Sequence, residues 1–260
     1  MLKVYLVQME SRPGKKPENL AKAREMVLQA RPAPNSLVLL PEMFATGYDP
    51  AQALLWKEPS SGNAPATTSS FLQQLSNETN CIIMGGGISE GANGITNHVG
   101  IHTPGSSAES AGYDKIHPFF PELELFSAGQ DVTLFKTSGF TVSPTICFDL
   151  RFPELYREAT ARGAQLFSVH ASWPAKRRAH WEVLLKARAI ENQAYVAAVN
   201  CVTSDGKYSG DSQIIDPLGN VVVKAEPGKE CVISAEVDID FLDKCREDFP
   251  VLPKGSRARL

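Results

Sequence analysis

Short apolar runs recur along the chain, and several of them are apolar at consecutive positions rather than at every second position. Such runs lie at residues 3–9, 36–40 and 81–87, the last of which ends in three glycines. Continuous apolarity is typical of strands that are covered on both faces. Between these runs, residues 17–30 and 67–79 carry their apolar side chains at helical spacing. The pattern therefore predicts strands that alternate with helices, each strand being buried on both sides.

The rest of the chain repeats this plan and adds two hairpins. The further predicted elements are strands at 97–103, 109–114 and 141–146, a helix at 153–162, a strand at 165–170, a helix at 179–192, and strands at 194–201, 212–216, 221–224 and 231–237. Two halves that each mix parallel and hairpin connections favour an α/β fold, a four-layer α-β-β-α sandwich of two mixed sheets. Because no change in composition marks a linker, we predict a single domain over residues 1–260, with 249–260 as a C-terminal tail.

Composition narrows the class of partner. The chain has 260 residues, of which 43% are hydrophobic and 21% are charged, and its formal net charge is −3. This balance gives no reason to expect nucleic acid or an anionic membrane as a partner. No apolar run approaches the roughly 18 residues that span a bilayer, and we expect no signal peptide before the first strand. The basic run at 176–178 is expected to be mostly solvated surface.

The five cysteines are odd in number and widely scattered. They lie at positions 81, 147, 201, 231 and 245, without a Cys-x-x-Cys pair. This arrangement argues against a disulfide scaffold or a structural zinc site, so we expect no metal, no cofactor and a cytoplasmic location. Only Cys147 has reactive surroundings, and the other four cysteines are expected to be structural.

Cys147 stands where an apolar strand ends and a helical run begins, a junction at which α/β proteins place reactive groups. Glu42 and Lys115 also follow predicted strands. A thiol attacks as the thiolate, so it needs a proton acceptor such as the Glu42 carboxylate. Lys115 could stabilise the oxyanion that forms when sulfur attacks a carbonyl group. The three residues therefore predict acyl transfer from an amide to water.

Each of these residues also has a structural interpretation, and the pattern alone leaves both open. A cysteine at the end of an apolar strand is often a packed side chain. A glutamate after a strand-ending proline is usually a surface cap, and the pair Asp114-Lys115 is usually a solvated turn.

Three segments together resemble the nitrilase superfamily of carbon–nitrogen hydrolases. They read LLPEMF at 39–44, YDKIH at 113–117 and ICFDLRFPE at 146–154. The resemblance extends over almost the whole chain, from Val4 to about Pro253. It implies the α-β-β-α sandwich, a Glu-Lys-Cys triad and a homodimer or higher homo-oligomer, in which the predicted helices at 153–162 and 179–192 are the expected contact.

The superfamily's functional residues can be carried over position by position. The resemblance implies that Glu42 is the general base, Lys115 the stabiliser of the oxyanion and Cys147 the nucleophile. It also implies a second glutamate shortly after the lysine, which would orient the lysine and hold the substrate amide. Counting back from the Ala-Gly turn that follows places this residue at Glu122, with Glu124 as the alternative.

Within the superfamily, the segments SWP at 172–174, HW at 180–181 and ARAIENQ at 187–193 resemble the ω-amidase branch. The resemblance implies hydrolysis of terminal amides of 2-oxo acids, such as 2-oxoglutaramate, to a carboxylate and ammonia. The alternatives with the same triad are an amidase of deaminated glutathione, an N-carbamoyl-amino-acid hydrolase and a nitrile hydrolase. A catalytically retired binding module is the non-enzyme alternative, and the intact triad argues against it.

A small substrate of this kind needs a cation for its carboxylate. Arg151, four residues after the nucleophile, is the candidate because a guanidinium pairs bidentately with a carboxylate. It could equally fix its own loop by pairing with an acid. The candidates for the walls of the substrate pocket are Phe148, Phe44, Tyr48 and Trp173, although aromatic residues near strand ends could equally belong to the core.

Overall fold

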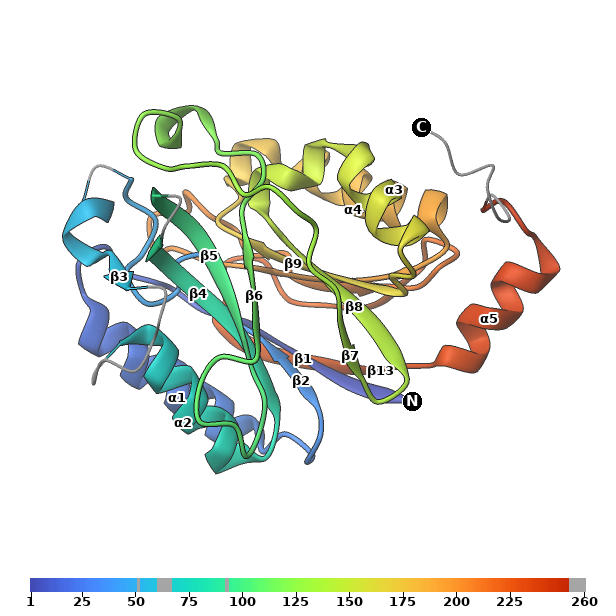
Figure 1. The fold of residues 1–260 in the computed structure, drawn as a ribbon, viewed down its shortest axis with the longest axis horizontal. Coiled ribbons are helices and arrows are strands. Elements are labelled where there is room, and N and C mark those ends of the chain that lie inside the picture. The colour runs from blue at the N-terminus through green and yellow to red at the C-terminus, as the bar shows by residue number, and fades with distance from the viewer. Residues whose placement is uncertain (51, 60–66, 92–93, 253–260) are drawn as a thin grey trace.

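The computed structural model describes residues 1–50, 52–59, 67–91 and 94–252, and it shows two mixed β-sheets that lie face to face with helices outside (Figure 1). The helices that cover the first sheet are α1 (Lys16–Ala30) and α2 (Thr68–Thr79), and those that cover the second are α3 (Pro153–Ala161) and α4 (Arg178–Asn192). The predicted four-layer α-β-β-α sandwich is therefore confirmed.

Each sheet combines parallel strands at its centre with antiparallel strands at its edges. The first sheet has the order β13 (Cys231–Val237), β1 (Leu2–Gln8), β2 (Leu37–Leu39), β4 (Ile82–Gly91), β5 (Gly94–His102) and β6 (Ala111–Asp114), with β3 (Glu58–Pro59) beside β4. The second has the order β12 (Val221–Lys224), β11 (Gln213–Ile215), β10 (Tyr195–Asn200), β9 (Leu166–Ala171), β8 (Phe140–Ile146) and β7 (Phe135–Thr137). The antiparallel pairs β5–β6 and β11–β12 confirm the two predicted hairpins.

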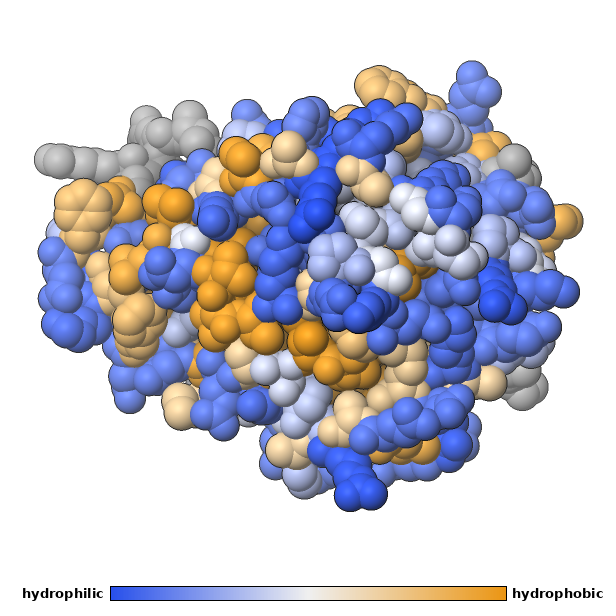
Figure 2. Space-filling model, turned by 180° about the vertical axis from the view of Figure 1, so that it is seen from behind, coloured by the Kyte–Doolittle hydropathy of each residue, from blue (hydrophilic) through white to orange (hydrophobic). Residues whose placement is uncertain are grey.

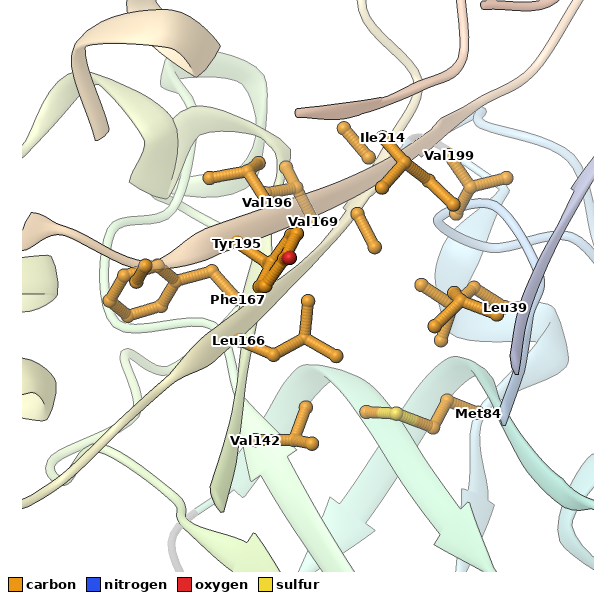
Figure 3. Packing of buried hydrophobic residues seen from close by; sticks show 14 of the residues in the cluster. Leu39, Met84, Val142, Leu166, Phe167, Val169, Tyr195, Val196, Val199 and Ile214 are labelled. Carbon is orange, nitrogen blue, oxygen red and sulfur yellow. The ribbon is translucent and has the colours of Figure 1, made fainter. Parts of the chain in front are cut away.

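Consecutive apolar residues in a strand serve two different layers, as β2 and its neighbours show. Leu39 joins the core between the two sheets, whereas Val38 belongs to a second core under α1 and α2. Figure 3 shows the core between the sheets, where Leu39 and Met84 from the first sheet point toward Val142 and Leu166 from the second. Burying one such side chain stabilises the fold by about 1.5–3 kcal/mol. Both cores explain why the strands are apolar at consecutive positions.

The hydrophobic pattern does not predict α5 (Ile239–Asp248), because most of this segment is charged. Asp238 caps the helix by accepting a hydrogen bond from the backbone N–H of Asp240. The buried positions of the helix are Leu242 and Cys245. Two buried positions are too few to form a visible helical stripe in the sequence.

The remaining differences from the sequence prediction are short elements. β7 has three residues, and the 3₁₀ helices are η1 (Ala53–Trp56), η2 (Phe120–Glu122), η3 (Cys147–Arg151) and η4 (Ala175–Arg177). Residues 249–252 of the predicted tail follow α5, and residues 253–260 lie outside the described part of the chain. Among the described helices, none combines the length and the apolarity that a membrane crossing requires.

Candidate active site

A lysine ammonium held between two carboxylates forms the centre of the site. The Nζ atom of Lys115 lies 2.9 Å from Oε1 of Glu42 and 2.8 Å from Oε2 of Glu122. The side chains are at most 1% exposed. Burial alone would lower the pKa of Lys115, but the charges of Glu42 and Glu122 outweigh this effect and raise it above its ordinary value. Lys115 is therefore a permanent cation in a fixed position.

Further donors hold both carboxylates in place. The side-chain amide of Asn97 donates to Oε1 of Glu42 over 2.8 Å and to Oε1 of Glu122 over 3.1 Å. The backbone N–H of Ser172 donates to Oε2 of Glu42 over 2.9 Å, and that of Phe119 donates to Oε2 of Glu122 over 2.6 Å. Hydrogen bonds to an ionised carboxylate are shorter and stronger than neutral ones. The two carboxylates therefore have little freedom to move away from the ammonium.

Cys147 begins the turn η3 with a φ of 46°, in the left-handed region. This conformation costs a non-glycine residue about 1–2 kcal/mol, and such strain concentrates at functional sites. Burial, and next the negative charge of Glu42, raise the pKa of the Cys147 thiol well above its ordinary value, although the Lys115 ammonium and the backbone of Ser172 act in the opposite direction. The resting sulfur is therefore protonated, and a base must remove its proton before it can attack.

Asp149 fixes the turn of the nucleophile against the segment of the lysine. Its buried carboxylate accepts hydrogen bonds from the backbone N–H groups of Ile146 and His117, each over 2.9 Å, and from the hydroxyl of Tyr113 over 2.7 Å. Ile146 precedes the nucleophile, and His117 follows the lysine by two residues. One carboxylate thus sets the separation between the two segments.

The turn that carries the thiol opens into a cavity of about 1030 Å³. The aromatic residues of its lining are Tyr48, Phe119, Phe120, Phe148, Trp173 and Tyr208. The basic residues of its lining are Arg151, Lys176, Arg177, His180 and Lys207, and Asp49 is the acidic residue among the described lining positions. Aromatic walls with an excess of positive charge suit a small anionic ligand.

Arg151 is held in this cavity by aromatic rings rather than by an acid. The centre of its guanidinium lies 4.7 Å from the ring centroid of Trp173 and 5.8 Å from that of Phe148. Its Nη2 atom lies 3.3 Å from Nδ1 of His180. Within the described part of the chain, no carboxylate oxygen forms an ion pair with Arg151. A guanidinium that stacks on aromatic faces keeps donors available for a carboxylate, so the geometry favours substrate binding over loop fixation.

Of the aromatic residues that the sequence suggests for the pocket walls, Tyr48, Phe148 and Trp173 line the cavity. Phe44 does not: it is fully buried in the core under α1 and α2, with its ring centroid 6.3 Å from that of Phe71. The suggestion that Phe44 contacts substrate is therefore wrong, and the structural interpretation of this residue holds. Its side chain is needed to fill the layer between sheet and helices.

The two candidate glutamates that follow the lysine differ in their surroundings. Glu122 contacts the ammonium of Lys115, whereas Glu124 is exposed. Burial raises the pKa of Glu122, and the charge of Lys115 partly opposes this effect. The position of Glu122 is therefore the one that can orient the lysine.

The basic run at 176–178 is divided between the cavity and the surface. Lys176 and Arg177 line the cavity, whereas the guanidinium of Arg178 lies 2.7 Å from Asp211. Lys176 and Arg178 are exposed and Arg177 is half-buried, so the expectation of a mostly solvated surface holds for two of the three residues. The 3₁₀ turn η4 ends at Arg177, and helix α4 begins at Arg178.

Sequence reasoning misses Asn97, Ser172 and Asp149, which position the groups described above. Asn97 lies inside strand β5, where nothing in the local pattern shows which layer its side chain faces. Ser172 acts through its backbone N–H, which leaves no trace in the residue type.

Across the residues that the structure describes, no group of three or more His, Cys, Asp and Glu side chains is arranged to hold a metal ion.

Comparison with known proteins finds a matching family and similar proteins over most of the chain. The sequence profile of the family described as Carbon-nitrogen hydrolase matches residues 3–247. A 2-oxoglutaramate amidase of Bacillus subtilis is 34% identical over 258 residues, which cover 95% of this chain and 95% of that protein. Omega-amidase NIT2 of Xenopus tropicalis is 32% identical over 264 residues, which cover 96% of this chain and 93% of that protein.

A solved structure shows the same architecture. Nit3 of Saccharomyces cerevisiae, described as a member of branch 10 of the nitrilase superfamily, matches with a TM-score of 0.86 and 28% sequence identity. The match covers 97% of this chain and 96% of that one. The likeness over nearly the whole of both chains includes the two sheets that position the site.

Proposed function

The chain belongs to the carbon–nitrogen hydrolase family, within the nitrilase superfamily, and we propose that it hydrolyses terminal amides of 2-oxo acids such as 2-oxoglutaramate. The observation that carries the proposal is the buried Lys115 cation, held by Glu42 and Glu122 beside a thiol that opens into a positively charged cavity. The names of two relatives, a 2-oxoglutaramate amidase and an omega-amidase, support the choice of substrate.

In the first step Glu42 takes the proton of Cys147 while the sulfur attacks the carbonyl carbon of the amide. A C–S bond forms, and the π electrons of the carbonyl group move onto its oxygen. Lys115 and the backbone N–H groups that follow Cys147 stabilise this oxyanion, a contribution that is often the largest in acyl transfer. The raised pKa of the thiol is the reason that a base is required.

In the second step protonated Glu42 gives its proton to the amide nitrogen, the C–N bond breaks, and ammonia leaves. The acyl group now forms a thioester with Cys147. Glu42 then takes a proton from water, whose oxygen attacks the thioester carbon. The C–S bond breaks, the proton returns to sulfur, and the carboxylic acid is released. One amide and one water give one acid and one ammonia, and no cofactor takes part.

Glu122 acts through the lysine and on the substrate nitrogen. Its contact of 2.8 Å with Nζ of Lys115 supports a positioning role, because the ammonium would otherwise be held by one carboxylate alone. Both oxygens of Glu122 accept from Nζ of Lys115, over 3.1 and 2.8 Å, and the remaining lone pairs of the carboxylate can accept a hydrogen bond from the substrate amide. The carbonyl group would then face the ammonium.

The other end of the substrate lies against Arg151. A stacked guanidinium without an acidic partner supports pairing with the substrate carboxylate. Phe148, Tyr48 and Trp173 supply the walls that separate this end from solvent. Charge at one end and the thiol at the other would set the length of the acid that fits.

Ammonia release tests the proposal directly. Purified wild type should release ammonia from 2-oxoglutaramate, and the Cys147→Ala variant should release none while keeping the same melting temperature. A folded wild type that hydrolyses deaminated glutathione or carbamoyl amino acids, but not 2-oxoglutaramate, would show that the substrate is wrong. A Cys147→Ala variant with full turnover would overturn the thiol mechanism itself.

The proposal includes a homodimer formed through α3 and α4. Val183 and Ile190 on α4 are 66% and 52% exposed. Leu218 is 57% exposed and precedes Gly219, whose backbone lies close to the side chain of Ile190. Figure 2 shows that hydrophobic side chains gather on the face opposite to the view of Figure 1. Exposed apolar surface of this kind supports association with a second copy.

Sedimentation of wild type and of Val183→Glu tests the homodimer. Wild type should sediment as a dimer at micromolar concentration, and the variant should dissociate. Leu55→Glu, at a position that is 79% exposed on η1, is the matched control and should remain dimeric. A wild type that is monomeric at every concentration would contradict the proposal.

A cytoplasmic location is also part of the proposal. All five cysteines are free thiols, which supports a reducing compartment. Fractionation of cells that produce the protein, with detection in the cytoplasmic fraction, is the test.

A further inference from the structure

We infer that the guanidinium groups of Arg177 and Arg151 together bind the 2-oxo acid end of the substrate. The inference rests on the proposed function and names a second specificity-determining residue for it. Arg177 ends the turn η4 and lines the same cavity as Cys147 and Arg151. Nothing in its sequence context, a run of three basic residues, separates it from a solvated surface.

The first observation is that the two arginines are fixed to one another through Trp173. The indole N–H of Trp173 donates to the backbone carbonyl of Arg177 over 2.9 Å. The ring of the same tryptophan carries the guanidinium of Arg151, whose centre lies 4.7 Å from the ring centroid. Trp173 is only 3% exposed, so the backbone of one arginine and the side chain of the other share a rigid support.

The second observation is that the head of Arg177 is also stacked. Its guanidinium centre lies 5.7 Å from the ring centroid of Phe119. Phe119 in turn lies against Phe148, with ring centroids 5.2 Å apart, and Phe148 is the second ring beneath Arg151. Aromatic rings therefore hold both guanidinium groups, and stacking leaves their edge N–H groups free to donate.

The third observation is that the two positive charges act on each other. Burial and next the charge of Arg177 lower the pKa of Arg151 from its ordinary value. In the described part of the chain, neither guanidinium forms an ion pair with a carboxylate. Two cations that are brought together without a neutralising acid repel each other, and an anion placed between them removes that cost.

The donor pattern selects the chemistry of the ligand. A 2-oxo acid offers three oxygens in one plane, two from the carboxylate and one from the adjacent carbonyl group. One guanidinium can pair with the two carboxylate oxygens, and a second guanidinium can bind a carboxylate oxygen together with the oxo oxygen. A carboxylate without an adjacent oxo group can pair with the first guanidinium through both oxygens, but it offers the second guanidinium only one acceptor. The pair should therefore prefer a 2-oxo acid to the same acid without the oxo group.

The other basic residues of the cavity are less well fixed. Lys176 and Lys207 are exposed, and an ammonium on a flexible chain acts as a point charge rather than a fork. Arg178, the neighbour of Arg177, lies 2.7 Å from Asp211 and 3.3 Å from Glu182. Since Lys224 lies 3.3 Å from Asp211 as well, Arg178→Gln removes the same charge without leaving that acid unpaired, and it is the matched control.

The experiment compares wild type, Arg177→Gln, Arg177→Lys and Arg178→Gln on three amides of equal chain length: 2-oxoglutaramate, glutaramate, which lacks the oxo group, and neutral pentanamide. Arg177→Gln should lower kcat/KM for 2-oxoglutaramate about 10- to 100-fold, mainly through KM, because a charged hydrogen-bonding partner is lost. It should lower the value for glutaramate less, and leave pentanamide within about two-fold. Arg177→Lys should restore part of the loss, and Arg178→Gln should match wild type on all three substrates.

Inhibition by the product gives a second readout that does not depend on turnover of the oxo amide. The inhibition constant of 2-oxoglutarate against pentanamide hydrolysis should rise in Arg177→Gln by a factor similar to that in kcat/KM. An equal loss on all three amides, or an equal loss in Arg178→Gln, would overturn the role of Arg177. A wild type that hydrolyses pentanamide but not 2-oxoglutaramate would refute the proposed substrate alone, and the inhibition constants of 2-oxoglutarate and glutarate would still decide the role of Arg177.

Discussion

The backbone N–H of Ser172 donates to Oε2 of Glu42 over 2.9 Å, although 130 residues separate the two positions. Glu42 follows β2 of the first sheet, and Ser172 follows β9 of the second. The proposed base is therefore held by both sheets at once. Any change that shifts one sheet against the other would move the carboxylate relative to the thiol.

The first prediction concerns the second carboxylate at the lysine. Glu122→Gln should lower kcat for amide hydrolysis about 100-fold, because Lys115 would keep only one charged partner and lose its fixed direction toward the oxyanion. Glu124→Gln, two residues away and exposed, should stay within about two-fold of wild type. Steady-state ammonia release by both variants is the measurement, and equal rates for the two would remove Glu122 from the mechanism.

The second prediction concerns the acid behind the nucleophile. Asp149→Asn should lower the free energy of unfolding by about 1–3 kcal/mol, because an amide N–H₂ would face the N–H and O–H donors that the carboxylate now accepts. The Asp131→Asn variant removes the same charge at an exposed position, and its free energy of unfolding should equal that of wild type. Urea denaturation gives both values. Loss of activity in Asp149→Asn should accompany the loss of stability, and full stability would contradict the anchoring role.

The third prediction concerns the stacked arginine. Arg151→Ala should raise KM for 2-oxoglutaramate about 10- to 100-fold, because a charged partner of the carboxylate is removed. KM for a neutral amide of the same length should change far less. Initial rates over a range of each substrate separate the two effects. Equal increases on both amides would mean that Arg151 shapes the cavity without binding the carboxylate.

Much of this site could be predicted because residues of reactive type stand directly after predicted strands in the sequence. Glu42, Lys115 and Cys147 each follow a predicted strand, and strand ends that lie at one edge of a sandwich bring such residues together. Glu122 could be placed only through resemblance, since nothing in the local pattern separates it from Glu124. The layers followed from the consecutive apolar positions, which require a cover on both faces of each sheet.

The remainder could not be predicted because it depends on directions that the residue type does not encode. Phe44 lies two residues after the proposed base but turns into the core, after a left-handed residue at Met43 with a φ of 47°. Arg177 lies in a basic run that reads as surface, and only the turn η4 directs it to the cavity. Helix α5 is stabilised by a cap and two buried side chains, a signal weaker than the charge that surrounds it.

The last prediction concerns a histidine on the opposite face of the strand that carries Asn97. Nδ1 of His98 lies 2.8 Å from Asp114, and its Nε2 lies 3.0 Å from Glu109. Burial alone would lower the pKa of His98, but the hydrogen bonds to Asp114 and Glu109 outweigh it and raise the pKa to about 9. In the folded protein this residue is therefore an imidazolium between two carboxylates, and it ties the loop before β6 to the strand that leads to Lys115.

The direction in which His98 changes stability with pH follows from its pKa in the folded and in the unfolded protein. The unfolded chain loses the proton of His98 near its ordinary pKa of 6.5, whereas the folded chain keeps it up to about pH 9. The contribution is therefore complete below pH 6.5 and disappears as the pH rises toward 9, at up to about 1.4 kcal/mol per pH unit. Urea denaturation of wild type and His98→Gln at half-unit steps from pH 6 to 9.5 measures it, because groups common to both cancel in the difference. The advantage of wild type should shrink steadily across this window, and an advantage that is the same at every pH would show that His98 is neutral in the folded protein.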